Sequence, residues 1–159
     1  MSKREPDPVL VVGDLMLDEA WFGRRERVCP DAPAPVFRVQ RRESTLGGAS
    51  RVAQVLAELD VPVQVVGVIG DDPAGEELLG QLQQRGIGVD GVVVDVLRPT
   101  PVKRSHFEGI HARANTKVFR VDLESRDELS LELRAKLNHE INQVRDTASL
   151  VVVSDYVKG

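Results

Sequence analysis

Two aspartates near the start of the chain are the first residues whose type and spacing could do chemistry. Asp14 and Asp18 follow an apolar run at 9–12 and the glycine that ends it. Such a run predicts a strand buried on both faces, as in the centre of a parallel sheet. Ligands of open α/β sheets bind beyond the carboxyl ends of such strands, and carboxylates accept hydrogen bonds from hydroxyl groups. The pair could therefore hold a polyol; an N-cap and an ordinary surface charge are the alternative.

A glycine pair and two cations are the other candidates for ligand contact. Gly47 and Gly48 precede a helical pattern, where a ligand could approach the backbone and its free N–H groups. By spacing alone, a tight turn is the simpler interpretation. Lys103 and Arg104 could meet an anion, although solvated cations on a strand are commoner. The histidines have no acidic or cysteine partner at ligand spacing, which predicts no metal site: His106, His111 and His139.

The composition is that of an ordinary globular protein. The chain has 159 residues, enough for one domain with its own core, and 42% of them are hydrophobic. A net charge of -4 gives no reason to expect nucleic acid or a membrane surface as a partner. Cys29 is the single cysteine, which excludes an internal disulfide. With no signal peptide and no membrane-spanning run, a cytoplasmic location is expected.

Alternating strand and helix patterns predict the fold class. Apolar runs at 63–70 and 149–153 predict further buried strands, and the segments 19–46 and 87–124 are β-rich excursions from this alternation. Helical patterns open at three places: Gly48, Pro73 and Ser130. The order predicts an α/β fold with a doubly wound, mostly parallel sheet and a small accessory β lid built from the two excursions.

Local signals predict details of the connecting segments. Residues 1–8 are polar and are expected to be a disordered lead-in. The segment 29–35 holds three prolines, which suit an edge strand or an extended arm, and 36–39 predicts a short half-exposed strand. The runs 102–108 and 116–124 flank a loop and predict a hairpin.

The last predicted strand, at 149–153, needs neighbours and a covering helix on each face, and nothing after it in the chain supplies them. We therefore expect the first half of a larger domain. Closure of the sheet by another chain is the alternative.

The order of the motifs is more specific than any one of them. In register along residues 9–159, the chain resembles the ribokinase/PfkB family of carbohydrate kinases, and within it the kinases of heptose 7-phosphate that serve ADP-heptose and lipopolysaccharide synthesis. The segments that carry the resemblance are GDLMLD, APAPV, LGGAS, VGVIGDDPAGEEL, RPTPVK, FRVDLE and VVVSDYVKG. The resemblance implies the N-terminal half of a ribokinase-like domain, acting on a sugar phosphate with ATP and Mg²⁺ in the complete enzyme.

The resemblance also implies roles for single residues. Four residues would bind sugar hydroxyls: Asp14, Asp18, Gly47 and Gly48. Three match lid and hinge positions of the family: Lys103, Arg120 and Asp122. Asp155 and Lys158 would face the phosphate-transfer side, near the nucleotide and its magnesium. The lid would close over the sugar and pair with the lid of a second subunit in a homodimer.

Departures from the family pattern limit what this chain could do. Arg51 stands where relatives usually carry Asn, and Ser105 where Arg is common. The Gly-Ala-Gly-Asp segment that carries the catalytic base is absent, so no catalytic residue is expected here and the chain alone is expected to be inactive. Two alternatives stay open: a non-catalytic remnant that binds sugar phosphate or another subunit, and a kinase for another sugar, such as fructose phosphate or ribose.

Overall fold

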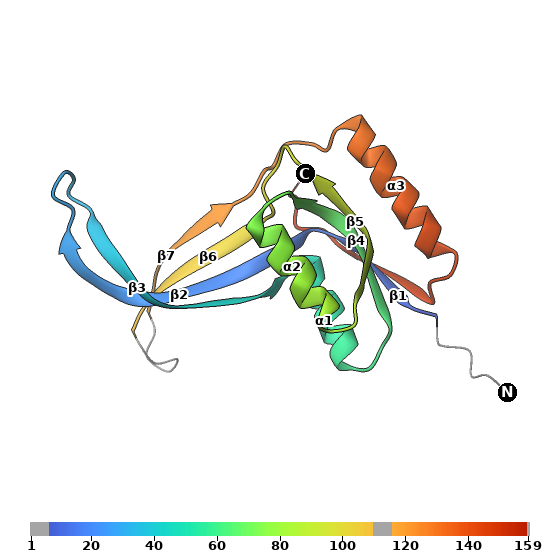
Figure 1. Cartoon of the computed structure of the whole chain (residues 1–159), viewed down its shortest axis with the longest axis horizontal. Helices are drawn as coiled ribbons and strands as arrows, with labels where there is room; N and C mark the ends of the chain where they lie inside the picture. Colours follow the sequence, from blue (N-terminus) through green and yellow to red (C-terminus); the bar gives the residue numbers. More distant parts are fainter. Residues whose placement is uncertain (1–6, 110–115, 159) are drawn as a thin grey trace.

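The computed structural model describes residues 7–109 and 116–158, and within them the chain forms two four-stranded sheets and three helices (Figure 1). The first sheet has the strand order β5-β4-β1-β8, and every neighbouring pair in it is parallel. Its strands are β1 (Val9–Gly13), β4 (Val63–Gly70), β5 (Gly88–Asp95) and β8 (Leu150–Ser154). The central strands of a parallel sheet are covered on both faces, which explains why Leu10 and Val11 are fully buried.

Helices cover both faces of the parallel sheet. On one face, α1 (Gly48–Glu58) and α2 (Pro73–Gln83) pack over the larger core; on the other, α3 (Leu131–Arg145) packs through Leu137, Ile141 and Val144. The predicted helix starts are confirmed, and Asp72 and Ser130 cap α2 and α3. On α1, Ala49 and Ala53 are fully buried, and Val52 and Leu56 pack against the same core.

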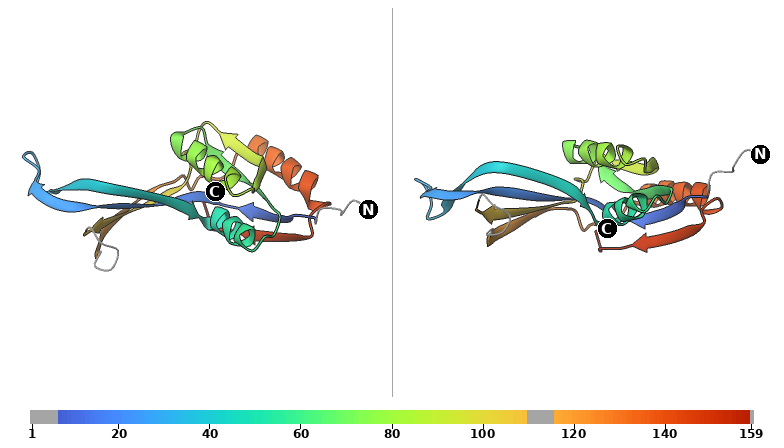
Figure 2. Two further views of the ribbon diagram at one scale, coloured as in Figure 1. Left: turned by 60° about the horizontal axis from the view of Figure 1, so that its bottom comes forward. Right: turned by 90° about the horizontal axis from the view of Figure 1, so that it is seen from below.

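The second sheet is the lid, and it extends from one end of the parallel sheet (Figure 2). Its order is β3-β2-β6-β7, with β2 parallel to β6 and the other pairs antiparallel. The strands are β2 (Leu15–Val28), β3 (Pro35–Gly47), β6 (Val102–Glu108) and β7 (Thr116–Leu123). Because β1 continues into β2 after a single residue, the parallel sheet positions the lid directly.

The structure corrects the expected extent of the lid. The excursion predicted over 87–124 contains β5, which pairs with β4 in the parallel sheet, so its lid part begins only at Val102. A strand that follows a helix such as α2 returns in parallel to the same sheet, and the apolar run after Gly86 obeys that rule. The hairpin of β6 and β7 is confirmed.

In the proline-rich segment, Pro35 begins the edge strand β3, as expected, whereas residues 29–34 form no strand. The chain start also differs in part from expectation. Residues 29–34 form the turn of the long β2–β3 hairpin, where the Cys29 amide donates to the Ala34 carbonyl at 2.7 Å. The expected short strand at 36–39 belongs to the 13-residue β3. Of the expected lead-in, residues 1–6 lie outside the described part, but Pro8 is anchored, because its carbonyl accepts from the Ser149 amide at 2.9 Å.

One edge of the parallel sheet is left uncovered within the described residues. Strand β8 pairs only with β1, and Val151 and Val153 are 41% and 72% exposed. Both share the sheet face of Leu10 and Val12, on which α3 packs over the other strands. No helix among the described residues has the length and apolar character needed to cross a membrane.

Candidate functional site

Asp14 lies where three elements meet. Its amide donates to the Ser154 carbonyl at the end of β8 (3.1 Å), and its carbonyl accepts from the Ala49 amide at the start of α1 (2.9 Å). Its side-chain Oδ2 accepts from the Tyr156 amide at 2.6 Å. One carboxylate oxygen is therefore used to hold the segment after β8, and no described contact occupies the other.

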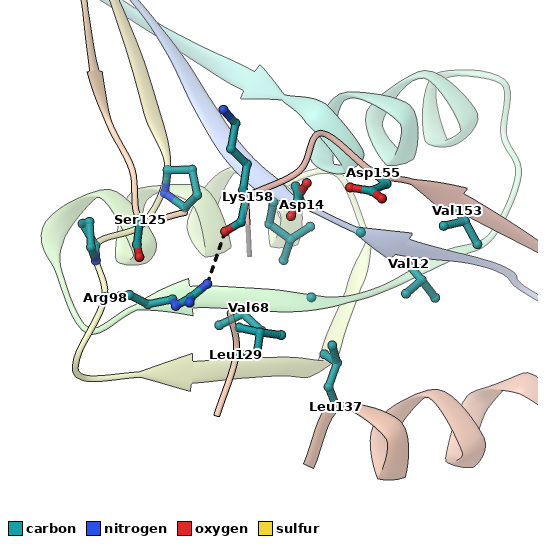
Figure 3. A pocket seen from close by; sticks show the side chains of 15 residues that line it. Val12, Asp14, Val68, Arg98, Ser125, Leu129, Leu137, Val153, Asp155 and Lys158 are labelled. Atoms are coloured by element: carbon teal, nitrogen blue, oxygen red, sulfur yellow. Dashed lines mark hydrogen bonds between the residues drawn. The ribbon is translucent and has the colours of Figure 1, made fainter. Parts of the chain in front are cut away.

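A cavity of about 240 Å³ opens beside Asp14 at the carboxyl ends of β1 and β4. Its floor is apolar and includes Val12 and Val68, while Asp14 and Asp155 supply carboxylates at its edge (Figure 3). Arg98 contributes a cation to the same lining. A pocket at this end of a doubly wound sheet, with few polar groups on an apolar floor, is the usual form of a small-molecule site.

Asp18 lies on the lid, apart from this cavity. On β2 it is opposite Thr45 of β3 and Lys103 of β6. A groove of about 310 Å³ collects Asp18 and a set of polar and basic side chains on the same lid face: Thr45, Lys103, Ser105, Lys117 and Arg120. Arg120 is paired with Asp122 through Nε to Oδ1 at 2.7 Å. The two aspartates that the sequence groups together thus line two neighbouring hollows.

The two glycines lie between these hollows. A Cβ at Gly47 would be 2.8 Å from Oδ2 of Asp18, and a Cβ at Gly48 would be 2.5 Å from the Asp14 carbonyl oxygen. Gly48 also has a φ of +53°, a conformation that favours glycine. Both glycines are therefore required because β3 and α1 pass so close to the two aspartates. A tight turn alone would not explain this requirement.

The segment after β8 connects the cavity with the groove. The Tyr156 amide binds Asp14, and the Lys103 ammonium lies 4.9 Å from the centre of the Tyr156 ring. The sequence gives no local signal of a role for Lys117, and within the VVVSDYVKG segment no role is predicted for Tyr156. Strict strand alternation would put Lys117 on the face opposite Arg120; a bulge in the β6–β7 pairing brings both to the groove.

Lys158 lines the cavity with its backbone, but its ammonium points away from Arg98 and Val68 (Figure 3). Its Nζ lies 2.6 Å from Oε2 of Glu124, and the side chains of Lys158 and Glu124 are only 11% and 8% exposed. The hydrogen bond from Lys158 lowers the pKa of Glu124 below its ordinary value. The expected placement of Asp155 and Lys158 at the phosphate-transfer side stays a prediction; Asp155 lies at the cavity edge.

The remaining candidates lie outside both hollows. Arg51 is exposed on α1, where it donates to Gln54 at 3.3 Å. His106 is buried on the opposite lid face, stacked on Phe119 at 4.1 Å, and burial lowers its pKa. His139 contacts Gln143 on α3, whereas His111 lies outside the described residues. In the described part of the chain, no three His, Cys, Asp or Glu residues are grouped to hold a metal ion.

Solved structures show the fold. Ribokinase from Arabidopsis thaliana, complexed with ribose and ATP, superposes with a TM-score of 0.64 and 18% identity over 93% of this chain and 45% of that one. A sugar kinase from Pyrococcus horikoshii in complex with ATP gives a TM-score of 0.58 and 19% identity, over 91% and 42%. The expected fold is confirmed: a ribokinase-like α/β protein with a mostly parallel sheet and a β lid, covering under half of these structures.

The family follows from sequence. The model of the pfkB family of carbohydrate kinases matches residues 7–154, and the chain belongs to this family. The bifunctional protein HldE of Helicobacter pylori (strain ATCC 700392 / 26695) is 40% identical over 151 residues, which are 95% of this chain and 32% of that protein. HldE of Geotalea uraniireducens is 41% identical over 150 residues, 94% and 30% respectively. The chain thus spans about a third of these relatives.

Proposed function

We propose that the chain is the sugar-binding half of an ATP-dependent carbohydrate kinase that phosphorylates heptose 7-phosphate at its anomeric hydroxyl. The observation that carries this proposal is the pairing of two kinds of group on adjoining surfaces. Asp14 and Asp18 offer carboxylates to hydroxyl groups, and Lys103, Lys117 and Arg120 gather beside Asp18 on one lid face. A sugar phosphate has both the hydroxyl donors and the anionic group that such a surface recognises.

The chemistry of phosphoryl transfer assigns this chain a positioning role. Catalysis in such reactions rests mainly on orienting the reactants and on neutralising charge. The lid face would hold the sugar phosphate, while Asp14 would orient a hydroxyl group with the carboxylate oxygen that Tyr156 leaves available. The Gly-Ala-Gly-Asp segment is absent from the sequence, so the base that would take the proton of the attacking hydroxyl is absent too.

ATP and Mg²⁺ belong to the complete enzyme in this proposal. Mg²⁺ in kinases is bound through one or two carboxylates together with the phosphates of the nucleotide. Asp155 lines the cavity edge and is the carboxylate that would help to hold the ion there. When bound, Mg²⁺ would neutralise charge on the transferred phosphoryl group.

The test measures binding and transfer separately. Titration calorimetry of the chain with heptose 7-phosphate is expected to show binding, at least tenfold tighter than with unphosphorylated heptose. An ATP-consumption assay on the same samples is expected to show no turnover. If no sugar phosphate binds, the proposal fails; equal affinity with and without the phosphate would remove the role of the lid cations.

A panel of sugars distinguishes the two alternatives. Tighter binding of fructose phosphate or ribose than of heptose 7-phosphate would assign another pfkB substrate. Binding without transfer, even when the second half of a related kinase is supplied, would favour a non-catalytic sugar-phosphate-binding protein.

We also propose that the lid pairs with a second copy of the chain. The lid face opposite the groove carries partly exposed apolar side chains on β7: Phe119, Val121 and Leu123, each about 40% exposed. β7 is an edge strand of its sheet, and such a surface is suited to association. Light scattering is expected to give the mass of a dimer, whereas a monomeric mass at micromolar concentration would contradict this pairing.

A further inference from the structure

The segment 155–158 is connected to both parts of the molecule. It is held to the parallel sheet by the Tyr156 amide, which donates to Asp14 at 2.6 Å. It is held to the lid by the Lys158–Glu124 ion pair, at 2.6 Å, and by the Lys103 ammonium over the Tyr156 ring. Glu124 directly follows β7, so the ion pair acts where the lid returns to the parallel sheet.

The Lys158–Glu124 pair is the most secluded of these contacts. Both side chains are about nine-tenths removed from solvent, and Glu124 also accepts from Arg126 Nε at 2.9 Å. Removing one partner of an ion pair this far from water strongly destabilises the local structure, because the other charge is left buried and uncompensated. Exposed pairs contribute little by comparison.

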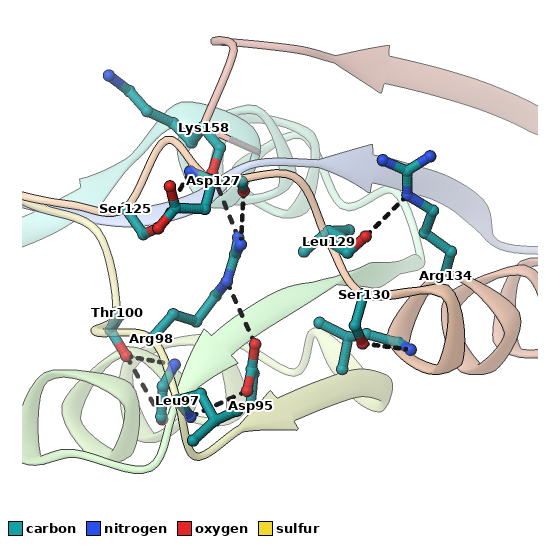
Figure 4. A network of polar contacts seen from close by, with 12 residues as sticks. Asp95, Leu97, Arg98, Thr100, Ser125, Asp127, Leu129, Ser130, Arg134 and Lys158 are labelled. Carbon is teal, nitrogen blue, oxygen red and sulfur yellow. Dashed lines mark hydrogen bonds and ion pairs between the residues drawn. The ribbon is translucent and has the colours of Figure 1, made fainter.

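Arg98 fixes the backbone on both sides of the pair. Its guanidinium donates to the carbonyls of Lys158 at 3.3 Å and of Asp127 at 2.8 Å, and its Nε lies 3.3 Å from Asp95 Oδ2 (Figure 4). Arg98 itself belongs to the connection from β5 to β6. Three segments that join or adjoin the lid, around 98, 124–127 and 158, therefore share one polar network.

The backbone of the segment is held in an unfavourable conformation. Val157 has a φ of +57°, which is costly for a β-branched residue. Its amide donates to Oδ1 of Asp155 at 2.7 Å, closing a tight turn. Such conformations persist where the surrounding contacts determine them, and here contacts to Asp14, Glu124 and Arg98 lie on either side.

We propose that residues 155–158 are a clamp that sets the angle of the lid over the parallel sheet, with Lys158–Glu124 as its closing contact. Lys158 and Glu124 are positioning residues: by holding the lid at one angle, they fix where the Asp18 groove lies relative to the Asp14 cavity. The clamp is independent of which ligand binds, so its test remains valid if the proposed function fails.

The test measures the lid angle directly with two spin labels. In a Cys29→Ser background, Asp31→Cys places one label at the tip of the β2–β3 hairpin, and Asn138→Cys places the other on an exposed position of α3. Dilution of labelled chain with unlabelled chain removes distances between copies. The unmodified clamp is expected to give one narrow distance distribution.

Variants of the pair decide the outcome. Lys158→Met and Glu124→Gln are each expected to at least double the width of the distribution, and the exchange Glu124→Lys with Lys158→Glu to restore most of the narrow form. Lys136→Met is the matched control, because it removes the exposed Lys136–Glu132 pair of α3, and is expected to change nothing.

Circular dichroism establishes that each variant is folded. A folded single variant with an unchanged distribution would overturn the clamp. If the single variants do not fold, the exchanged variant decides: a narrow distribution supports the clamp, and a broad one or a failure to fold overturns it.

Discussion

At the scale of single residues, the proposed role of Asp18 depends on the cations that lie beside it in the groove. Its location opposite Lys103 and Thr45 distinguishes Asp18 from the other carboxylates of the chain. Asp90, exposed on β5, has the same chemistry in a surrounding without such a groove.

Asp18→Asn is expected to weaken heptose 7-phosphate binding about tenfold, because a charged acceptor of hydroxyl hydrogen bonds becomes a neutral amide. Calorimetry measures the change, with Asp90→Asn as the control that leaves affinity unaltered. An Asp18→Asn chain that binds as tightly as the unmodified one would remove Asp18 from the proposed site.

Gly48→Ala is expected to lower the free energy of unfolding by about 2 kcal/mol or more, since the new Cβ would meet the Asp14 carbonyl and the φ of +53° disfavours alanine. Gly80→Ala is the control, and it is expected to change the free energy of unfolding in the opposite direction. Gly80 lies in α2 with open space around the added Cβ, so stability should rise by about 0.5–1 kcal/mol. Urea denaturation measures the free energy of unfolding of both variants. Equal changes would contradict the conclusion that Gly48 is required by the close approach of α1 to Asp14.

At the scale of elements, Asp72 connects α2 to the segment that leads into the lid. Its side chain accepts from the Gly75 amide at the start of α2 and from the Thr100 amide just before β6, both at 2.8 Å. Burial opposes ionisation of Asp72, but these hydrogen bonds outweigh it and lower the pKa below its ordinary value. The residue therefore supports two elements through one carboxylate.

Asp72→Ala is expected to cost about 2 kcal/mol of unfolding free energy, whereas Asp71→Ala, at the exposed neighbouring position, should cost almost nothing. The folded-state pKa of Asp72 is lowered, so its contribution is present above the ordinary value of 3.8 and is lost as the pH falls below it. Denaturation at pH 7 and pH 3 measures this. A difference between the unmodified chain and Asp72→Ala that grows towards low pH would contradict the assignment.

At the scale of the whole molecule, β8 leaves an apolar strip beside α3. Val151 and Val153 point to the face on which α3 covers the other strands but has no described core contact with β8. Its neighbour Val152 points the other way and packs against the larger core. The chain should therefore bind dyes that recognise exposed apolar surface.

Val153→Glu is expected to reduce that dye binding while changing stability by less than about 0.5 kcal/mol, because the side chain is already 72% exposed. Val152→Glu, one residue away, should destabilise the fold by several times as much, since it would place a charge against the core. Dye fluorescence and thermal melting separate the two effects. Equal destabilisation by both variants would show that the strip is covered.

The sequence by itself determined three strands of the parallel sheet (β1, β4 and β8), the helix starts near Pro73 and Ser130, and the family. These features depend on local signals: apolar runs, capping residues and motifs in a given order, all carried by neighbouring residues.

Only the tertiary structure decided how distant segments meet. It placed β5 in the parallel sheet rather than in the lid, assigned Asp14 and Asp18 to separate hollows, and paired Lys158 with Glu124. The physical reason is that strand partners and ion pairs join positions tens of residues apart. Periodicity shows which face of an element is buried, but not which other segment covers it.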